Sequence, residues 1–305
     1  MKKLLIILIF TISLSARTIS PNEVYSLSVL IQDHIHFLLK YYGIKHDHNG
    51  ILKKDKILSA KLKPRNVWQK NYEVLVKINM LRQTHGLQRI EPVGIEAREH
   101  LTPDLVYEMN ERILTELKIF EMRKSIDVPK FKRKKFVSKT PLNNYNAFVD
   151  ISAALDELNQ QALTPDYVYA ETMRIYDDIG LMLSYLDITD NTSPEMKKIN
   201  ATPKDSVEIT MKILDYIGQL QVSVGIEGID FSEFNKEHVY PSDVYTMTGL
   251  ILAELQTIKA YIGLTNHITP SALAYSRKKP ENVGQLMTWN LKRLKLIREL
   301  HRRGK

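Results

Sequence analysis

Hydrophobic positions recur along this chain in eight copies of one pattern, and a proline begins each copy. The prolines are Pro21, Pro64, Pro103, Pro141, Pro165, Pro203, Pro241 and Pro280. After Pro21, for example, the apolar residues Ile31, Ile35 and Leu38 follow at steps of four and three. Such steps place side chains on one face of an α-helix. The pattern therefore predicts eight amphipathic helices of one design.

The residues around each proline predict where the helices begin. Proline suits the first turn of a helix, because the N–H that it lacks has no intrahelical partner there. Hydroxyl residues that can cap a helix precede several of the prolines, at Ser20, Thr102, Thr140, Thr164 and Thr202. Each predicted helix therefore begins at its proline.

The eight copies form two sets of four that repeat each other in order. Equivalent prolines lie 138 to 144 residues apart. The connecting segments match too, since Gly86-Leu87 and Gly225-Ile226 lie 139 residues apart, where a glycine is expected to end a helix. We interpret the chain as an all-α protein of tandem helical repeats, in which a four-helix unit is duplicated at 17–162 and 163–305. Such units bury their apolar faces by stacking on their neighbours.

The spacing of the prolines predicts how the helices connect. Most gaps are 38 to 43 residues long, whereas Pro141 and Pro165 are only 24 residues apart. This short gap allows only a tight turn, so the two helices that it joins are predicted to be antiparallel neighbours. The spacing leaves open whether the two units form separate bundles or one continuous array.

Residues 1–16 have the composition of a secretory signal peptide. A basic start at Lys2-Lys3 precedes an apolar run of about ten residues, which ends in the small residues Ser13, Ser15 and Ala16. The run is shorter than the ~20 residues that a membrane-spanning helix needs. We expect cleavage after Ser15 or Ala16 and export, with the periplasm as the compartment. An uncleaved N-terminal anchor is the alternative.

Composition supports a folded helical protein and narrows its chemistry. Apolar residues make up 44% of the chain and charged residues 26%, as in ordinary globular proteins. There is no cysteine, which excludes disulfides, thiol catalysis, thiolate zinc sites and a lipid-anchored lipoprotein. An exported chain of this kind must be held together by its packed core alone.

An excess of basic residues marks two segments of a chain whose formal net charge is +8. The candidate binding residues are Lys132, Arg133, Lys134 and Lys135 in the first segment and Arg298, Arg302 and Arg303 in the C-terminal tail. They suit an anionic membrane, a cell-wall polymer or an acidic protein face, and export argues against nucleic acid as the partner. The alternative interpretation is a solvated loop and a soluble tail.

Four of the copies carry the longer signature Pro-x-x-Val-Tyr, whose tyrosines are Tyr25, Tyr107, Tyr169 and Tyr245. These side chains are candidate binding residues, because tyrosine combines a large apolar ring with a polar end and often anchors a partner. In the alternative interpretation each tyrosine packs where helices meet and its hydroxyl bonds to a neighbouring backbone.

Polar motifs with catalytic or metal-binding spacing are scarce. Glu99-His100 and Glu237-His238 hold equivalent positions ahead of two helices, where capping explains them. His34, His36 and the run His46-Asp47-His48 offer metal ligands, but nothing in the sequence fixes the further ligands that a zinc site needs. No phosphate-binding glycine loop or hydrolase signature is present. The sequence therefore predicts no enzyme, no cofactor and no metal site.

These observations predict an exported protein that works by binding. The leading hypothesis is a non-catalytic scaffold or adaptor that binds other proteins in a bacterial envelope assembly, such as a motility, secretion or wall-associated complex. The second hypothesis is a periplasmic module that binds or senses a small molecule in a bundle or in a cleft between the units. The third is electrostatic docking on an anionic membrane or wall polymer through the basic segments. The sequence leaves the oligomeric state open.

Overall fold

The computed structural model describes residues 18–46, 61–229 and 238–300. The expected signal peptide at 1–16 and the tail residues Arg302 and Arg303 lie outside the described residues. Within the described part the protein is all-helical, which confirms the predicted fold class. The helices are α1 (Pro21–Tyr41), α3 (Pro64–Thr84), α4 (Pro103–Arg123), α5 (Pro141–Asn159), α6 (Pro165–Tyr185), α7 (Pro203–Ser223), α8 (Pro241–Ile262) and α9 (Pro280–Leu294). None of them is long and apolar enough to cross a membrane.

Every one of these helices begins at its predicted proline, and the residue before it has extended backbone. Ser20 and Thr202 each accept a hydrogen bond from the backbone N–H three residues later, as expected of a capping hydroxyl. At Thr140 the hydrogen bond runs in the opposite direction: the backbone N–H of Thr140 donates to the side-chain oxygen of Asn143 at 3.0 Å. The predicted starts are therefore confirmed, although the capping atom differs from helix to helix.

The helix ends also follow the sequence pattern. Gly86 and Gly225 have φ angles of +71° and +75°, in the left-handed region that favours glycine. The next N–H, that of Leu87 or Ile226, bonds back to a carbonyl five residues earlier at 2.8 and 2.9 Å. Both helices thus end in the same motif, with the glycine outside the last turn.

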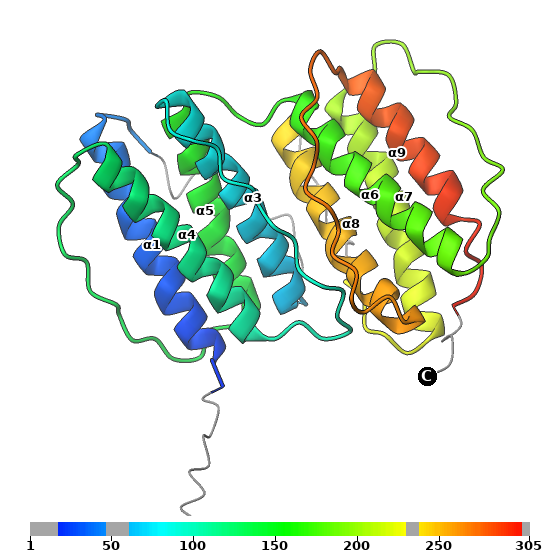
Figure 1. Cartoon of the computed structure of the whole chain (residues 1–305), viewed down its shortest axis with the longest axis horizontal. Coiled ribbons are helices and arrows are strands. Elements are labelled where there is room, and N and C mark those ends of the chain that lie inside the picture. The colour runs from blue at the N-terminus through cyan, green and yellow to red at the C-terminus, as the bar shows by residue number, and fades with distance from the viewer. Residues whose placement is uncertain (1–17, 47–60, 230–237, 301–305) are drawn as a thin grey trace, which may run out of the picture.

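The helices pack as two sets of four (Figure 1). In the first set α1 and α3 each contact both α4 and α5, and in the second set α6 and α7 each contact both α8 and α9. The four prolines that begin the first set surround one small hollow, so all four helices start at the same end of the bundle and run parallel. The longer connecting segments return the chain along the outside of the bundle to that end (Figure 1).

The two bundles point in opposite directions, which explains the short gap between Pro141 and Pro165. Helix α5 ends where α6 begins, and the connector 160–164 passes from one bundle to the other (Figure 1). The two helices therefore run in opposite senses, as predicted, but they make no contact with each other. The prediction that they are neighbours is wrong, because the connector crosses between bundles instead of turning within one.

The apolar ladder of each helix forms the core of its bundle. The positions fourteen residues after the prolines are fully buried, at Ile35, Ile78, Leu117, Leu155, Ile179, Ile217, Leu255 and Leu294. Ile297 and Leu300 continue the last ladder beyond the end of α9 and are buried as well. The apolar stripe of the C-terminal segment therefore packs into the second bundle up to Leu300.

The bundles meet through α3 and α8, which are buried along most of their length. At one end of the contact Arg65 Nη2 lies 2.9 Å from Glu254 Oε2, and further along α3 the Nζ of Lys70 donates to Thr246 Oγ1 at 3.1 Å. Since Glu254 follows Thr246 on α8, the two helices cross antiparallel. Polar groups that are buried in this way need partners, and here each helix supplies them to the other.

Candidate functional site

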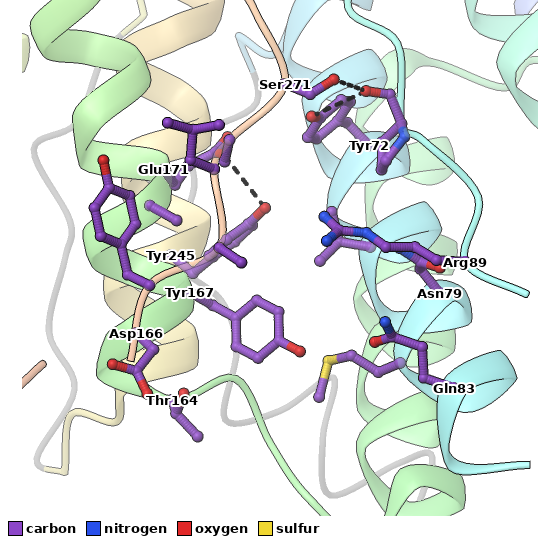
Figure 2. A pocket seen from close by; sticks show the side chains of 18 of the residues that line it. Tyr72, Asn79, Gln83, Arg89, Thr164, Asp166, Tyr167, Glu171, Tyr245 and Ser271 are labelled. Carbon is purple, nitrogen blue, oxygen red and sulfur yellow. Dashed lines mark hydrogen bonds between the residues drawn. The ribbon is translucent and has the colours of Figure 1, made fainter. Parts of the chain in front are cut away.

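A cleft of about 360 Å³ lies between the two bundles, and we call it the inter-unit cleft (Figure 2). Helix α3 forms one wall, and the first turns of α6 form the opposite wall. These two helices do not contact each other, so the space between them is bounded by other segments. Tyr245 of α8 and the connecting segments that contain Arg89 and Ser271 close it. The volume falls within the range of small-molecule sites.

A buried ion pair lies beside the cleft on the α6 side. Arg174 Nη1 donates to Glu171 Oε1 at 2.8 Å, and both side chains are almost fully buried. The hydroxyl of Tyr245 faces the other carboxylate oxygen of Glu171 at 3.4 Å (Figure 2). Burial and the Glu171 carboxylate raise the pKa of Tyr245 well above its usual value, so its phenol stays protonated. Glu171 and Arg174 therefore neutralise each other's charge at this wall of the cleft.

Tyr72 on α3 closes the opposite side of the same cluster. The Arg174 guanidinium lies 4.4 Å from the centre of its ring, a cation–π contact. Its hydroxyl and that of Ser271 both face the carbonyl of Pro92, at 3.4 and 2.7 Å. Burial raises the pKa of Tyr72 to about 12, although Arg174 opposes the shift. Tyr72 therefore has a neutral phenol. The connecting segments that contain Pro92 and Ser271, one from each bundle, meet at its hydroxyl.

Arg89 is the cleft residue with the clearest capacity to bind a ligand. Its side chain is exposed, and it forms no ion pair with any residue in the described part of the chain. Figure 2 shows its guanidinium pointing from the α3 side into the cleft, while the ring and hydroxyl of Tyr167 extend into the cleft from α6. Asn79 is held nearby, because its Oδ1 accepts from the backbone N–H of Ile90 at 3.0 Å. Cationic, phenolic and amide groups thus converge on one space.

A second polar network lies on another part of the contact between the bundles and has a structural role. Glu73 accepts from Lys70 Nζ at 2.8 Å and from the hydroxyl of Thr246 at 2.9 Å. Lys77 bonds to Asp156 of α5 at 2.7 Å. Burial alone would raise the pKa of Glu73, but the two ammonium groups outweigh it and hold that pKa at about 2. This network joins α3, α5 and α8, which positions the wall of the cleft.

The four signature tyrosines lie in different surroundings. Tyr25 and Tyr169 are partly buried and pack against the connecting segments that precede α5 and α9, through Lys139 and Lys278. Tyr107 bonds to Arg133 on the return segment of the first bundle. Tyr245 alone of the four lines the inter-unit cleft. The structure therefore does not bring these tyrosines together into one groove.

The basic segment 130–139 runs along the outside of α1 and α4. Arg133 pairs with Glu111, and Lys134 pairs with Asp33 at 3.2 Å. Lys132, Lys135 and Arg298 are exposed. Part of the positive charge is thus balanced by neighbouring acids, and the remainder faces solvent on separate parts of the surface.

The histidines also divide into separate surroundings. His36 and His46 both approach Asp150 of α5, a grouping that can hold a metal ion. His100 and His238 are exposed ahead of α4 and α8. The expected partners Asp47, His48 and Glu237 lie outside the described residues. Glu116, Asp178 and Glu254 share one repeat position but bond to Arg82, Lys259 and Arg65 respectively, so they form no carboxylate cluster.

Sequence reasoning missed Tyr72, Arg89, Tyr167 and Glu171 as cleft residues. A signal was present, because Glu171 and Arg174 are opposite charges on one helix face, spaced for an ion pair. These two residues face the first bundle because α3 packs against α8, and no local sequence pattern indicates that contact. No family model, curated protein or solved structure matches the chain.

Proposed function

We propose that the protein is an exported, non-catalytic binding protein that holds a small organic anion in the inter-unit cleft. The observation that carries this proposal is a cavity of about 360 Å³ into which the guanidinium of Arg89 points, with no ion pair to any residue that the structure describes. A cationic group that is left without an ion pair beside aromatic and amide groups favours a carboxylate or phosphate on the ligand. The periplasm is the compartment that we propose for it.

The protonation states of the cleft support binding in preference to catalysis. The pKa of Tyr72 is raised to about 12 by burial, and burial also raises that of Tyr245 well above its usual value, so neither phenol supplies a base at neutral pH. The carboxylate of Glu171 forms an ion pair with Arg174, whose Nη1 lies 2.8 Å from Glu171 Oε1. These groups are suited to donating hydrogen bonds and to shaping the cavity.

A ligand screen on the purified chain tests the proposal. Aromatic and aliphatic carboxylates and phosphate monoesters are compared by thermal shift and then by calorimetry. We expect one chemical class to raise the melting temperature, and we expect Arg89→Gln to weaken its binding about ten-fold or more through loss of a charge-assisted hydrogen bond. Arg98→Gln is the matched control, because Arg98 is about half exposed and its segment also contains Arg89.

A cavity-filling variant provides the second arm of the test. Ala170 lines the cleft and is buried, so Ala170→Phe places a ring in the space that a ligand needs. Binding that is unchanged in both Arg89→Gln and Ala170→Phe would place the ligand elsewhere and refute the proposal. A panel in which no organic anion stabilises the parent chain would also contradict it.

An envelope scaffold is the second candidate function, and one surface feature favours it. Tyr41, Tyr42 and Met122 are 54%, 37% and 67% exposed at the carboxyl ends of α1 and α4. Pulldowns from envelope extracts at several salt concentrations should recover a stoichiometric partner. The partner should be lost when Tyr41→Ser and Met122→Ser are combined, but it should be retained with Val222→Ser, a residue of the second bundle that is 74% exposed. Docking on an anionic membrane or wall polymer through the basic segments stays a prediction.

A further inference from the structure

Two histidines and an aspartate meet at the carboxyl end of α1, away from the inter-unit cleft. His36 belongs to α1, His46 follows the end of that helix, and Asp150 comes from the middle of α5. The Nε2 atoms of His36 and His46 each lie 2.9 Å from a different oxygen of the Asp150 carboxylate. One ligand atom from each of the three residues lies within 4.8 Å of the others. We call these residues the His–Asp cluster.

The surroundings of His46 require a cation at this position. Its Nε2 faces Asp150 at 2.9 Å and its Nδ1 faces Glu157 at 2.7 Å. A neutral imidazole carries a single N–H, so it cannot donate to both carboxylates at once. With the single N–H on Nδ1 and donated to Glu157, either a second proton or a metal ion must lie between His46 Nε2 and Asp150.

The second contact of His46 is the arrangement that metal-binding histidines use. Histidines that bind metal through one ring nitrogen commonly donate the other N–H to a carboxylate, which fixes the tautomer and the ring orientation. Glu157 is placed to accept from Nδ1 of His46 in this way. Asp150 is itself fixed by the side-chain amide of Gln32, which donates to its Oδ2.

The same region of the second bundle contains a permanent cation instead. The positions equivalent to His36, Asp150 and His46, counted from the prolines, are Gly180, Trp289 and Asp190. There the guanidinium of Arg293 lies against Gly180 and bonds to Asp190 at 2.6 Å. One bundle thus places a guanidinium where the other has two imidazoles around a carboxylate.

We propose that the His–Asp cluster binds a divalent transition-metal ion of the zinc class. Two imidazole nitrogens and one carboxylate oxygen are the donor set of many zinc sites, whereas calcium and magnesium prefer oxygen ligands. An open hollow bounded by His36, Leu39, Lys40, Gly43, Ile44 and His46 gives the ion a route from solvent and leaves a coordination position for water. This proposal is independent of the ligand in the inter-unit cleft.

Metal titration of the untagged, chelator-treated chain tests the proposal. Zn²⁺ is titrated by calorimetry, and Co²⁺ reports ligand geometry through its visible absorption. We expect one ion per chain, and we expect His36→Ala and His46→Ala each to weaken binding by about 100-fold or more. Glu157→Gln should weaken it by roughly 10–100-fold, as expected for a residue that only orients a ligand.

Controls separate this site from other histidines and from loss of the fold. His85→Ala removes a partly buried histidine at the end of α3 and should leave binding unchanged. The side chain of His36 is 37% exposed, so its replacement should preserve the helical circular dichroism even if a change at the buried Asp150 does not. Absence of stoichiometric Zn²⁺ binding at micromolar concentrations, or equal binding by the parent and His36→Ala, would overturn the proposal. Arg89→Gln should bind Zn²⁺ like the parent.

Discussion

Equivalent positions in the two bundles hold pairs of a basic and an acidic side chain in opposite orientation. In the first bundle His34 of α1 lies 2.7 Å from Glu121 of α4. In the second bundle Asp178 of α6 lies 2.8 Å from Lys259 of α8, at the same distances in sequence from the helix-starting prolines. The basic and acidic partners have exchanged helices, while the pair itself is retained. Both bundles therefore keep a basic and an acidic side chain in contact here, whichever helix supplies each of them.

Breaking the buried pair of the second bundle should strongly destabilise the protein. Asp178 and Lys259 are fully buried, and burial already lowers the pKa of Lys259. Asp178→Asn leaves an uncompensated ammonium group and is expected to cost about 3–5 kcal/mol. Replacing both residues, with Asp178→Leu and Lys259→Met, should recover most of that loss. Chemical denaturation measures both values, and a double variant as unstable as the single one would contradict this explanation.

The Glu73 network makes the folding stability of the protein depend on pH in the acidic range. The pKa of Glu73 is about 2 in the folded protein, below its ordinary value of 4.5. The stabilisation from this carboxylate is therefore complete above pH 4.5 and is lost as the pH falls towards 2. A shift of this size corresponds to roughly 3 kcal/mol.

Glu73→Gln should remove this acid dependence. The variant is less stable at neutral pH, because Lys70 and Lys77 lose their shared partner. The difference in unfolding free energy between parent and variant should be constant from pH 7 to pH 5 and should shrink below pH 4.5. Urea denaturation across this range measures it. A difference that stays constant down to pH 2.5 would show that Glu73 does not titrate in this way.

At the level of helices and connecting segments, two of the signature tyrosines hold the return segments against the bundles. Tyr25 contacts Phe136 with ring centres 4.8 Å apart, and Lys139 lies 4.6 Å from the centre of the same ring. Tyr169 makes the equivalent contacts with Tyr275 and Lys278. Each tyrosine therefore holds the segment that leads into the last helix of its bundle.

Tyr25→Ala should loosen the basic return segment without unfolding the bundle. The lost aromatic and cation–π contacts are worth about 1–2 kcal/mol together, which corresponds to a ~5–30-fold increase in local opening. Trypsin cleavage within 130–135 measures the change. Tyr169→Ala is the matched control, since it should loosen the segment before α9 and leave cleavage at 130–135 unaltered. Equal cleavage rates in the parent and Tyr25→Ala would contradict the role.

The sequence predicts single helices well and their arrangement poorly. Prolines, capping residues and the apolar ladder are local signals, so helix starts such as Pro64 and buried positions such as Ile78 follow directly from them. Parallel packing and the contact of α3 with α8 depend on long-range complementarity, as between Arg65 and Glu254. The cleft is a product of that contact, which is why Arg89 carried no signal of its own in the sequence.

For the molecule as a whole, the contact between bundles joins helices that are not equivalent. Helix α3 is second in its set, whereas α8 is third in the other set. Across this contact Arg65 bonds to both Glu254 and the carbonyl of Glu227, and Lys63 also pairs with Glu227. A backbone hydrogen bond also joins the return segments of the two bundles, since the N–H of Ala97 donates to the carbonyl of His267 at 3.1 Å. The bundles are thus held by a specific interface in addition to their connector.

Cutting the connector should therefore leave the bundles associated. A protease site inserted after Gln161 allows the folded chain to be cut between α5 and α6. We expect the two fragments to elute together at the size of the uncut parent in gel filtration. Arg65→Ala should promote their separation after cutting, because Glu254 then lacks its buried partner. Fragments of the otherwise unchanged chain that elute at half size would show that the connector alone joins them.

Parallel packing also has a consequence for how the chain folds. Among the described helices, those next to each other in the sequence of a bundle touch only as α3 with α4 and α7 with α8, while α1 packs on α5 from the opposite end of the unit's sequence. None of the described helices forms a hairpin with the next described helix, so the contact order is high for an all-helical protein and large loops must close first. Folding should accordingly be slower than in up-and-down bundles of similar size. Under the proposed export, an emerging unit would expose its apolar ladders until its fourth helix has emerged.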